Sequence, residues 1–188
     1  SINNLGALLQ DKGDLAAAEP LCREALEVSR ETLGDRHPDT LISIGNLGVL
    51  LKAKGDLAAA ELLCREALEG RRETLGDRHP HTLGSINNLG SLLYAKGDLA
   101  AAELLLREAL EVQRETLGDR HPSTLGSINN LGVLLLEKGD LAAAEPLLRE
   151  ALEGRHETLG DLHPSTLTSR NNLGALLQKM DDLTFTEG

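Results

Sequence analysis

The sequence predicts an all-α fold, a solenoid of helical hairpins stacked one on the next. Two observations predict it. The tract KGDLAAAE begins at Lys12 and returns every 42 residues, and a degraded copy, KMDDL, begins at Lys179. Between the tracts, apolar residues fall three or four positions apart, which is the spacing of one helical face. A fixed period of this length is typical of arrays in which each unit contacts only its neighbours.

The first helix of each hairpin, here called helix A, is predicted over 40–54 in the second repeat. Its apolar face holds Leu41, Ile44, Leu47, Gly48 and Leu51. A proline such as Pro80 opens the next helix A, where its missing amide would be unpaired in any case. Each such proline follows an aspartate and a histidine: Asp35 with His37, Asp77 with His79, Asp119 with His121, and Asp161 with His163. Two ligands per loop are too few for zinc, so these residues are predicted to cap helix A.

The second helix of each hairpin, helix B, is predicted over 57–75 in the same repeat. Gly55 before it tolerates a left-handed backbone, and Asp56 can accept hydrogen bonds from its first amides. Its buried side is predicted to carry Leu57, Ala60, Leu63, Cys64, Ala67, Leu68 and Leu75. Small residues at Gly48 and at 58–60 let the two helices approach closely, so they are predicted to pack as an antiparallel hairpin.

Two features of helix B depart from this simple pattern. Pro20 and Pro146 fall inside it, and proline removes a backbone hydrogen bond and usually kinks a helix. The first two turns are therefore predicted to be bent or loosened in those repeats. Glycine and valine alternate at another position, occupied by Val28, Gly70, Val112 and Gly154, and the pattern itself gives no reason for this.

Four hairpins and a final unpaired helix A give nine predicted helices in one array that spans residues 1–188. The predicted repeats cover about 1–36, 37–78, 79–120 and 121–162, with a final half repeat over 163–188. Each end of such an array exposes apolar surface that a further repeat would cover. End-to-end self-association between molecules is therefore one expectation.

The charge balance argues against nucleic acid and membrane partners. The chain has 19 Lys and Arg against 30 Asp and Glu, a formal net charge of −11. No apolar run approaches the roughly 20 residues that a membrane span needs. Cys22 and Cys64 occupy equivalent positions in neighbouring repeats, too far apart to form a disulfide, so both are predicted to be free thiols. Free thiols favour a cytoplasmic location.

The residues of one repeat resemble the tetratricopeptide repeat, through Leu47, Gly48, Gly55, Leu57, Ala60, Ala67 and Leu68. More narrowly, the strings NNLG, AEPL, REALE and ETLGDRHP are similar to the 42-residue repeats of the kinesin light chain family. The likeness covers essentially the whole chain. It departs at Leu51 and Cys64, where the family often has tyrosine or phenylalanine.

The resemblance implies a right-handed superhelix in which helix A lines a concave groove that holds a peptide or a segment of a partner protein. The family's groove positions correspond first to one asparagine in most repeats, namely Asn3, Asn87, Asn129 and Asn171, with Gly45 breaking the series. One and two turns later they include the further peptide-binding candidates Ser91, Tyr94 and Lys52. The lysines and arginines with which related repeats grip carboxylates are mostly missing from this face.

The asparagines of the NN pairs have two possible roles. An amide side chain carries donors and an acceptor, so a row of amides can pair with the backbone of an extended peptide without reading its sequence. This role is assigned to the first asparagine, with an interhelical role as the alternative. The second asparagine, as at Asn88 and Asn172, lies about 100° further around the helix and is predicted to face a neighbouring helix.

No catalytic or cofactor-binding constellation is found in the sequence. No serine or cysteine recurs with a histidine and a carboxylate in a triad-like arrangement, and the LGDRHP glycines lack the spacing and the lysine of a phosphate-binding loop. The sequence therefore predicts no enzyme, no cofactor and no metal site. It predicts a cytoplasmic protein-interaction scaffold that binds a protein or peptide partner, with a self-associating or structural spacer array as the alternative.

Overall fold

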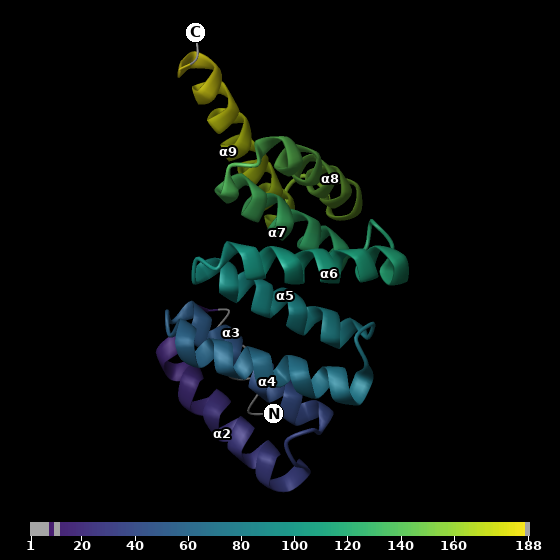
Figure 1. Cartoon of the computed structure of the whole chain (residues 1–188). Helices are drawn as coiled ribbons and strands as arrows, with labels where there is room; N and C mark the ends of the chain where they lie inside the picture. The colour runs from purple at the N-terminus through teal and green to yellow at the C-terminus, as the bar shows by residue number, and fades with distance from the viewer. Residues whose placement is uncertain (1–7, 10–11, 187–188) are drawn as a thin grey trace. The chain divides into compact units, whose positions relative to one another are not determined.

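The structure is a computed structural model that describes residues 8–9 and 12–186, with the backbone alone over 184–186. The described residues form eight helices and no strand (Figure 1). The helices are α2 (Leu15–Leu33), α3 (Pro38–Ala53), α4 (Leu57–Leu75), α5 (Pro80–Ala95), α6 (Leu99–Leu117), α7 (Pro122–Lys138), α8 (Leu141–Leu159) and α9 (Pro164–Thr186). The predicted all-α fold is confirmed. The ninth predicted helix, at the start of the chain, falls largely outside the described residues.

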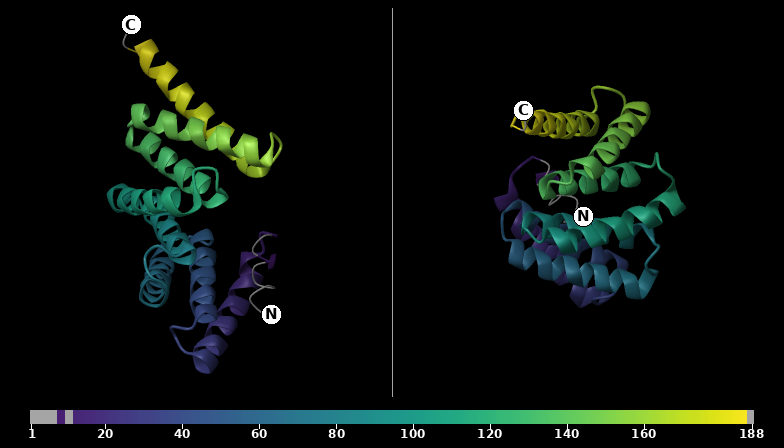
Figure 2. Two further views of the ribbon diagram at one scale, coloured as in Figure 1. Left: turned by 90° about the vertical axis from the view of Figure 1, so that its right-hand side faces the viewer. Right: turned by 45° about the horizontal axis from the view of Figure 1, so that its top comes forward.

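The helices form two compact units. Unit 1 spans Ser1–Asp98 and contains α2 to α5, and unit 2 spans Leu99–Gly188 and contains α6 to α9. Odd-numbered helices are helix A of their repeat, and even-numbered helices are helix B. Within each unit, every helix packs antiparallel against the next one along the chain (Figures 1 and 2). This is the packing predicted for a solenoid of helical hairpins, while the right-handed superhelix of the whole array stays a prediction.

The residues predicted to start and end the helices do so. Gly55 has a φ of +87°, and the Asp56 carboxylate accepts a 3.1 Å hydrogen bond from the Ala59 amide. At the start of α5, Nδ1 of His79 accepts a 3.1 Å hydrogen bond from the His81 amide. Equivalent bonds start α3, α7 and α9. The histidines are therefore N-caps, and each needs an unprotonated Nδ1 to accept this bond.

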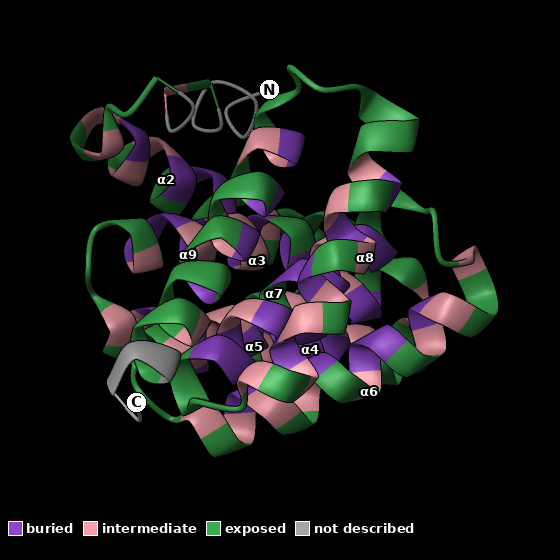
Figure 3. Cartoon of the chain, turned by 90° about the horizontal axis from the view of Figure 1, so that it is seen from above, coloured by how far each residue is buried: buried purple, intermediate pink, exposed green. Residues whose placement is uncertain are grey.

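The core of each unit lies along helix A, and α3 and α7 each pack against a helix B on either side. Leu41, Ile44 and Leu47 of α3 are at most 2% exposed. Gly48 lets α4 come close, because a Cβ placed on it would lie 3.0 Å from the Cys64 sulfur. Figure 3 shows buried residues alternating with exposed ones along the helices. Both cysteines are buried free thiols, as predicted, and burial raises the pKa of each.

Steric crowding explains the glycines at the position where glycine and valine alternate. A Cβ on Gly70 would lie 2.4 Å from Cδ2 of Leu41, which is itself buried. Gly154 meets Leu125 in the same way, also at 2.4 Å. Val28, at the equivalent place in α2, is exposed. A leucine of helix A therefore crowds Gly70 and Gly154, whereas Val112 at the same position shows that glycine is not required in every repeat.

Ion pairs join helices of neighbouring repeats. Glu61 of α4 pairs with Arg65 one turn further along and with Lys96 at the end of α5. The equivalent lysine pairs are Glu19 with Lys54 and Glu103 with Lys138. Arginines also reach the next helix B, from the preceding helix B in Arg30–Glu66 and Arg114–Glu150 and from the loop after it in Arg36–Glu73 and Arg120–Glu157. The charged side chains of helix B therefore connect repeats as well as meeting solvent.

The two prolines inside helix B are accommodated without a break. Pro20 lies within α2 and Pro146 within α8, and both helices are continuous over their full lengths. The equivalent residues of α4 and α6, Leu62 and Leu104, are strongly exposed. The proline rings therefore stand on the solvent side, and the predicted loosening of the first two turns is not seen as an interruption of either helix.

Replacing Pro146 by leucine is expected to raise the free energy of unfolding by about 1–3 kcal/mol, because it restores a helical N–H and removes the ring's clash with the preceding turn. Urea unfolding followed by circular dichroism measures the change. Leu104→Pro is the matched control and should lower the stability by a similar amount. If the Pro146→Leu variant had the same free energy of unfolding as the parent, Pro146 would not destabilise α8.

The repeated glutamate sites predict an acid-sensitive stability. Hydrogen bonds from Lys96 and then Arg65 lower the pKa of Glu61, so its stabilising contribution is present above the unfolded-state pKa and is lost as the pH falls through the lowered value. Glu61→Gln should therefore flatten the loss of stability that sets in as the pH falls below the ordinary carboxyl pKa of about 4.3, measured by urea unfolding at a series of pH values. Glu145→Gln is the control, since Glu145 pairs with Arg149 and has no lysine partner in the described residues. Equal flattening by both variants would contradict the role of the lysine.

Candidate functional site on the helix A surface

Within each unit the helices A approach one another more closely than the helices B. α3 packs against α5, and α7 packs against α9. In the described part of the chain, α2 and α4 have no comparable contact, nor do α6 and α8. Long arginine–glutamate pairs bridge these successive helices B instead. Each unit therefore curves toward its helix A side, which carries the predicted binding positions and is called the helix A surface below.

In unit 1 the structure brings two of the predicted binding residues into contact. Lys52 of α3 donates a 2.5 Å hydrogen bond from Nζ to Oγ of Ser91 on α5. Asn87 and Tyr94 lie one turn before and one turn after Ser91, on the same side of α5. All four side chains are half-buried. These four residues form what we call the polar strip, which crosses α3 and α5 and carries one aromatic ring.

Lys52 is the cation of the polar strip. Burial lowers the pKa of its ammonium group, and the nearby Cys64 only partly opposes this effect. Among the described residues it has a hydroxyl partner, Ser91, and no carboxylate within ion-pairing distance. An ammonium has three donors, so Lys52 retains the capacity to bind an oxygen of a ligand.

In unit 2 the first asparagine of the pair is buried rather than open. Asn129 of α7 is 5% exposed. Its Oδ1 accepts 3.1 Å hydrogen bonds from Ser169 Oγ and from Asn172 Nδ2, both on α9. The first asparagine of one repeat thus pairs with the second asparagine of the next. The interhelical role predicted for the second asparagine is confirmed at Asn172, and Asn129 shares it. Asn88 and Asn130, the second asparagines of two other repeats, are exposed, so the prediction does not hold in every repeat.

An arginine from helix B extends this network. Arg155 of α8 donates from Nη1 to Ser169 Oγ at 2.8 Å and to the Ser165 carbonyl oxygen at 3.0 Å. Burial lowers the pKa of its guanidinium, and both of these acceptors are neutral. The connected groups of Arg155, Ser169 and Asn129 join α8, α9 and α7. These hydrogen bonds hold the three helices together on the buried side of the helix A surface of unit 2.

Unit 1 has the same network without its asparagine, because Gly45 stands at the position equivalent to Asn129. Arg71 donates to Ser85 Oγ at 2.6 Å, as its counterpart does in unit 2, and also to the Leu41 carbonyl oxygen at 3.3 Å. A Cβ on Gly45 would lie 3.7 Å from Nη2 of Arg71. The guanidinium therefore lies beside the space that the amide takes in unit 2, and burial lowers its pKa as well.

The other predicted residues do not join the polar strip. Asn171 of α9 is exposed, and Asn3 lies outside the described residues. Sequence reasoning missed the two arginines of the networks, because both belong to helix B and not to the periodic face of helix A. The available signal was a change of residue type at one repeat position, which holds Ser29, Arg71, Gln113 and Arg155.

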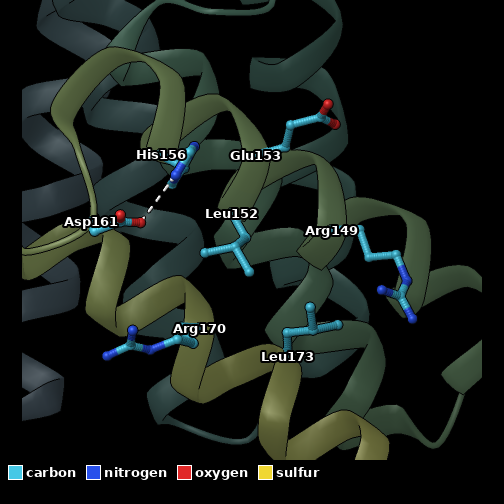
Figure 4. Close-up of a pocket in the computed structure, with 7 residues that line it drawn as sticks. All are labelled: Arg149, Leu152, Glu153, His156, Asp161, Arg170 and Leu173. Carbon is cyan, nitrogen blue, oxygen red and sulfur yellow. Dashed lines mark ion pairs between the residues drawn. The ribbon is translucent and has the colours of Figure 1, made fainter.

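Open clefts occur on another part of each unit, between a helix B and the helix A that follows it. Their volumes are about 270 Å³ between α2 and α3, 310 Å³ between α4 and α5, and 460 Å³ between α8 and α9. Figure 4 shows the largest, which is lined by Leu152 of α8 and Leu173 of α9 beside the ion pair of His156 with Asp161. None of the predicted binding residues lines these three clefts.

Two searches for other kinds of site gave nothing within residues 8–9 and 12–186. No three His, Cys, Asp or Glu side chains gather there in a way that could hold a metal ion. No helix in that part of the chain has both the length and the apolar character to cross a bilayer.

Comparison with known proteins identifies the repeat. The family model of the tetratricopeptide repeat matches residues 1–73, 46–115, 82–157 and 124–184, which together span nearly the whole chain. The chain belongs to the tetratricopeptide repeat family. No curated protein matches it.

Solved structures of tetratricopeptide arrays from kinesin light chain-like proteins are similar to this one. The nearly identical TPR-like repeats of such a protein from Podosopora anserina are 27% identical, with a TM-score of 0.79 over 99% of this chain and 88% of that chain. BtubC (BKLC) from P. vanneervenii is also 27% identical, with a TM-score of 0.80 over 99% of this chain and 74% of that chain. The predicted likeness to kinesin light chain-type tetratricopeptide repeats is confirmed.

Substituting Gly45 by asparagine is expected to raise the free energy of unfolding by about 1 kcal/mol, because a new amide oxygen can accept from Ser85 and asparagine forms helix better than glycine. The nearest atoms to a Cβ there, on Arg71, lie at ordinary contact distance. The reciprocal change, Asn129→Gly, should lower the stability by about 1–3 kcal/mol, since it leaves two donors unpaired. Urea unfolding of both variants measures the effect, and unchanged stability in both would contradict the network's role.

Proposed function

We propose that this tetratricopeptide repeat chain is a protein-interaction scaffold whose helix A surface binds an extended segment of a partner protein. Tetratricopeptide repeats generally mediate contacts between proteins. The observation that carries the proposal is the polar strip of unit 1, in which Lys52, Asn87, Ser91 and Tyr94 stand half-buried across two helices A.

The chemistry of the polar strip suits the main chain of an extended peptide. The ammonium of Lys52 can donate to peptide carbonyl oxygens, and the amide of Asn87 can both donate and accept. Neither interaction depends on the peptide's side chains, so the strip would recognise an extended backbone more than a particular sequence. The ring of Tyr94 adds a surface against which one apolar side chain can pack.

The same proposal covers the setting and the extent of the scaffold. Kinesin light chain-like tetratricopeptide proteins typically hold other proteins and are not enzymes, so we assign the chain no catalytic role and no cofactor. We further propose that residues 1–188 act as one array and that it works in the cytoplasm, where buried free thiols such as Cys22 and Cys64 remain reduced.

Selection of an unbiased displayed peptide library against the chain tests the proposal. The parent is expected to enrich a set of extended peptides, and a variant carrying Asn87→Ala and Tyr94→Ala should lose them by about tenfold or more in affinity, as loss of the hydrogen bonds and of the ring contact predicts. Affinities of the enriched peptides for both proteins are then measured by fluorescence anisotropy.

The matched control carries Leu62→Ala and Leu104→Ala, two strongly exposed positions on helices B. It should bind the same peptides as the parent. If the helix B control abolished binding while the polar-strip variant kept it, the assignment of the binding surface to helix A would be wrong. If the parent chain enriched no peptide from the library, the proposed peptide-binding function would be ruled out.

A further inference from the structure

One side of α9 has no helix packed on it in the described residues. Leu51 of α3 and Leu135 of α7 are each 2% exposed, whereas Leu177 at the equivalent position of α9 is 37% exposed. A Cβ on Gly174 would have nothing within 4 Å, although its counterparts Gly48 and Gly132 are closely packed by the following helix B. This side is called the α9 open face, and it consists of Leu167, Arg170, Gly174 and Leu177.

The α3–α4 hairpin shows what kind of element such a face accommodates. Gly48 lies against Cys64, and Leu41 lies against Gly70, so α4 runs antiparallel along α3. This register places Ile44, which is fully buried, opposite Ala67. An antiparallel helix is therefore the element whose shape fits the α9 open face.

The residue at the centre of the α9 open face differs from its counterparts in charge. Arg170 stands where the other described helices A carry Ile44, Ile86 and Ile128, each fully buried. Arg170 is exposed and also borders the α8–α9 cleft, whose lining includes Glu153 and Asp161, but no carboxylate within the described part of the chain forms an ion pair with it. A helix covering this face would remove the guanidinium from water, which is costly unless the helix supplies an opposite charge.

The chain's own helices B do not supply that charge. At the position facing the isoleucine they all carry alanine, as Ala25, Ala67, Ala109 and Ala151. A helix B of a second copy, which is the end-to-end contact expected from the sequence, would therefore cover Arg170 with a methyl group. This disfavours a copy of the chain as the natural occupant.

Two more residues at this end of unit 2 depart from the repeat. The arginines that pair with the next helix B, such as Arg30 with Glu66 and Arg114 with Glu150, are replaced by His156 in α8. His156 instead pairs with Asp161 of its own loop at 3.0 Å (Figure 4). The second arginine position, represented by Arg36 and Arg120, is taken by Leu162, which is 87% exposed. The usual anchors for another helix B are thus missing.

We propose that the α9 open face binds an amphipathic helix of a different protein, antiparallel to α9, with a carboxylate opposite Arg170. The α3–α4 register predicts the other residues of the partner helix. A small residue lies opposite Leu177, and an apolar residue one turn later along the partner helix lies opposite Gly174. The carboxylate follows after one further turn, and a second small residue lies opposite Leu167. This contact uses a different surface from the polar strip and does not depend on it.

The probes that test the proposal are three labelled peptides with the sequence of α6, Leu99–Leu117, which has neither proline nor cysteine. One is unmodified, one carries Ala109→Asp and one carries Ala109→Lys. Fluorescence anisotropy with the full chain is expected to give binding of the Ala109→Asp peptide about tenfold or more tighter than the unmodified peptide, and no binding of the Ala109→Lys peptide.

Two variants of the chain assign the effect to the α9 open face. Arg170→Ile should reverse the preference, so that the unmodified peptide binds more tightly than the Ala109→Asp peptide. Gly174→Leu should abolish binding of every peptide, since it fills the place where a helix would approach. It leaves the fold intact because no atom lies near that Cβ, and circular dichroism checks this. A variant carrying Asn87→Ala and Tyr94→Ala should bind the helical peptides as the parent does, which separates this test from that of the polar strip.

Two results would overturn the proposal. One is failure of the Ala109→Asp peptide to bind more tightly than the unmodified peptide. The other is a chain that sediments as an oligomer and becomes a monomer with Gly174→Leu, because a second copy would then be the occupant of the face.

Discussion

Helix A can be fully buried only if a helix B packs on each of its two sides, and a single hairpin supplies one of them. Ile44 and Leu47 reach near-complete burial because α3 lies between α2 and α4. Burying one such side chain is worth about 1.5–3 kcal/mol, so each junction between repeats carries a large share of the stability of its neighbours. α9 shows the converse, since the equivalents of buried leucines and glycines are exposed where no second helix B is described.

The polar contacts between repeats set how far the helices separate on the two sides of a unit. On the helix A side, short links such as Lys52 to Ser91 and Asn172 to Asn129 require close approach. On the helix B side, an arginine and a glutamate together span the wider gap, as between Arg30 and Glu66. The same layer of contacts therefore fixes the curvature of each unit and presents the helix A side chains.

Local signals in the sequence were sufficient to predict the helices. The predicted range of helix B in the second repeat agrees with α4, because Gly55 and Asp56 determine its start through backbone conformation and capping alone. The burial of Asn129 could not be predicted in this way. Its partners lie 40 and 43 residues away, and their contact depends on the register between repeats and not on the helix that carries it.

The candidate site was predictable as a surface but not as a set of contacts. The helical period correctly put Lys52 and Ser91 on facing helices, and the structure adds the hydrogen bond between them. The role of Arg71 was not predicted, because its long side chain reaches from helix B to the space beside Gly45. The crowding at Gly70 was not predicted because it comes from one leucine on another helix.

The glutamate–lysine pairs between repeats have a consequence for how such a gene can change. Glu19–Lys54, Glu61–Lys96 and Glu103–Lys138 all span 35 residues. Unequal crossing-over that adds or removes one complete 42-residue unit would give each of these partners an identical replacement. The number of repeats can therefore change by whole units without loss of these ion pairs, whereas insertion or loss of part of a unit would separate the glutamate from its lysine.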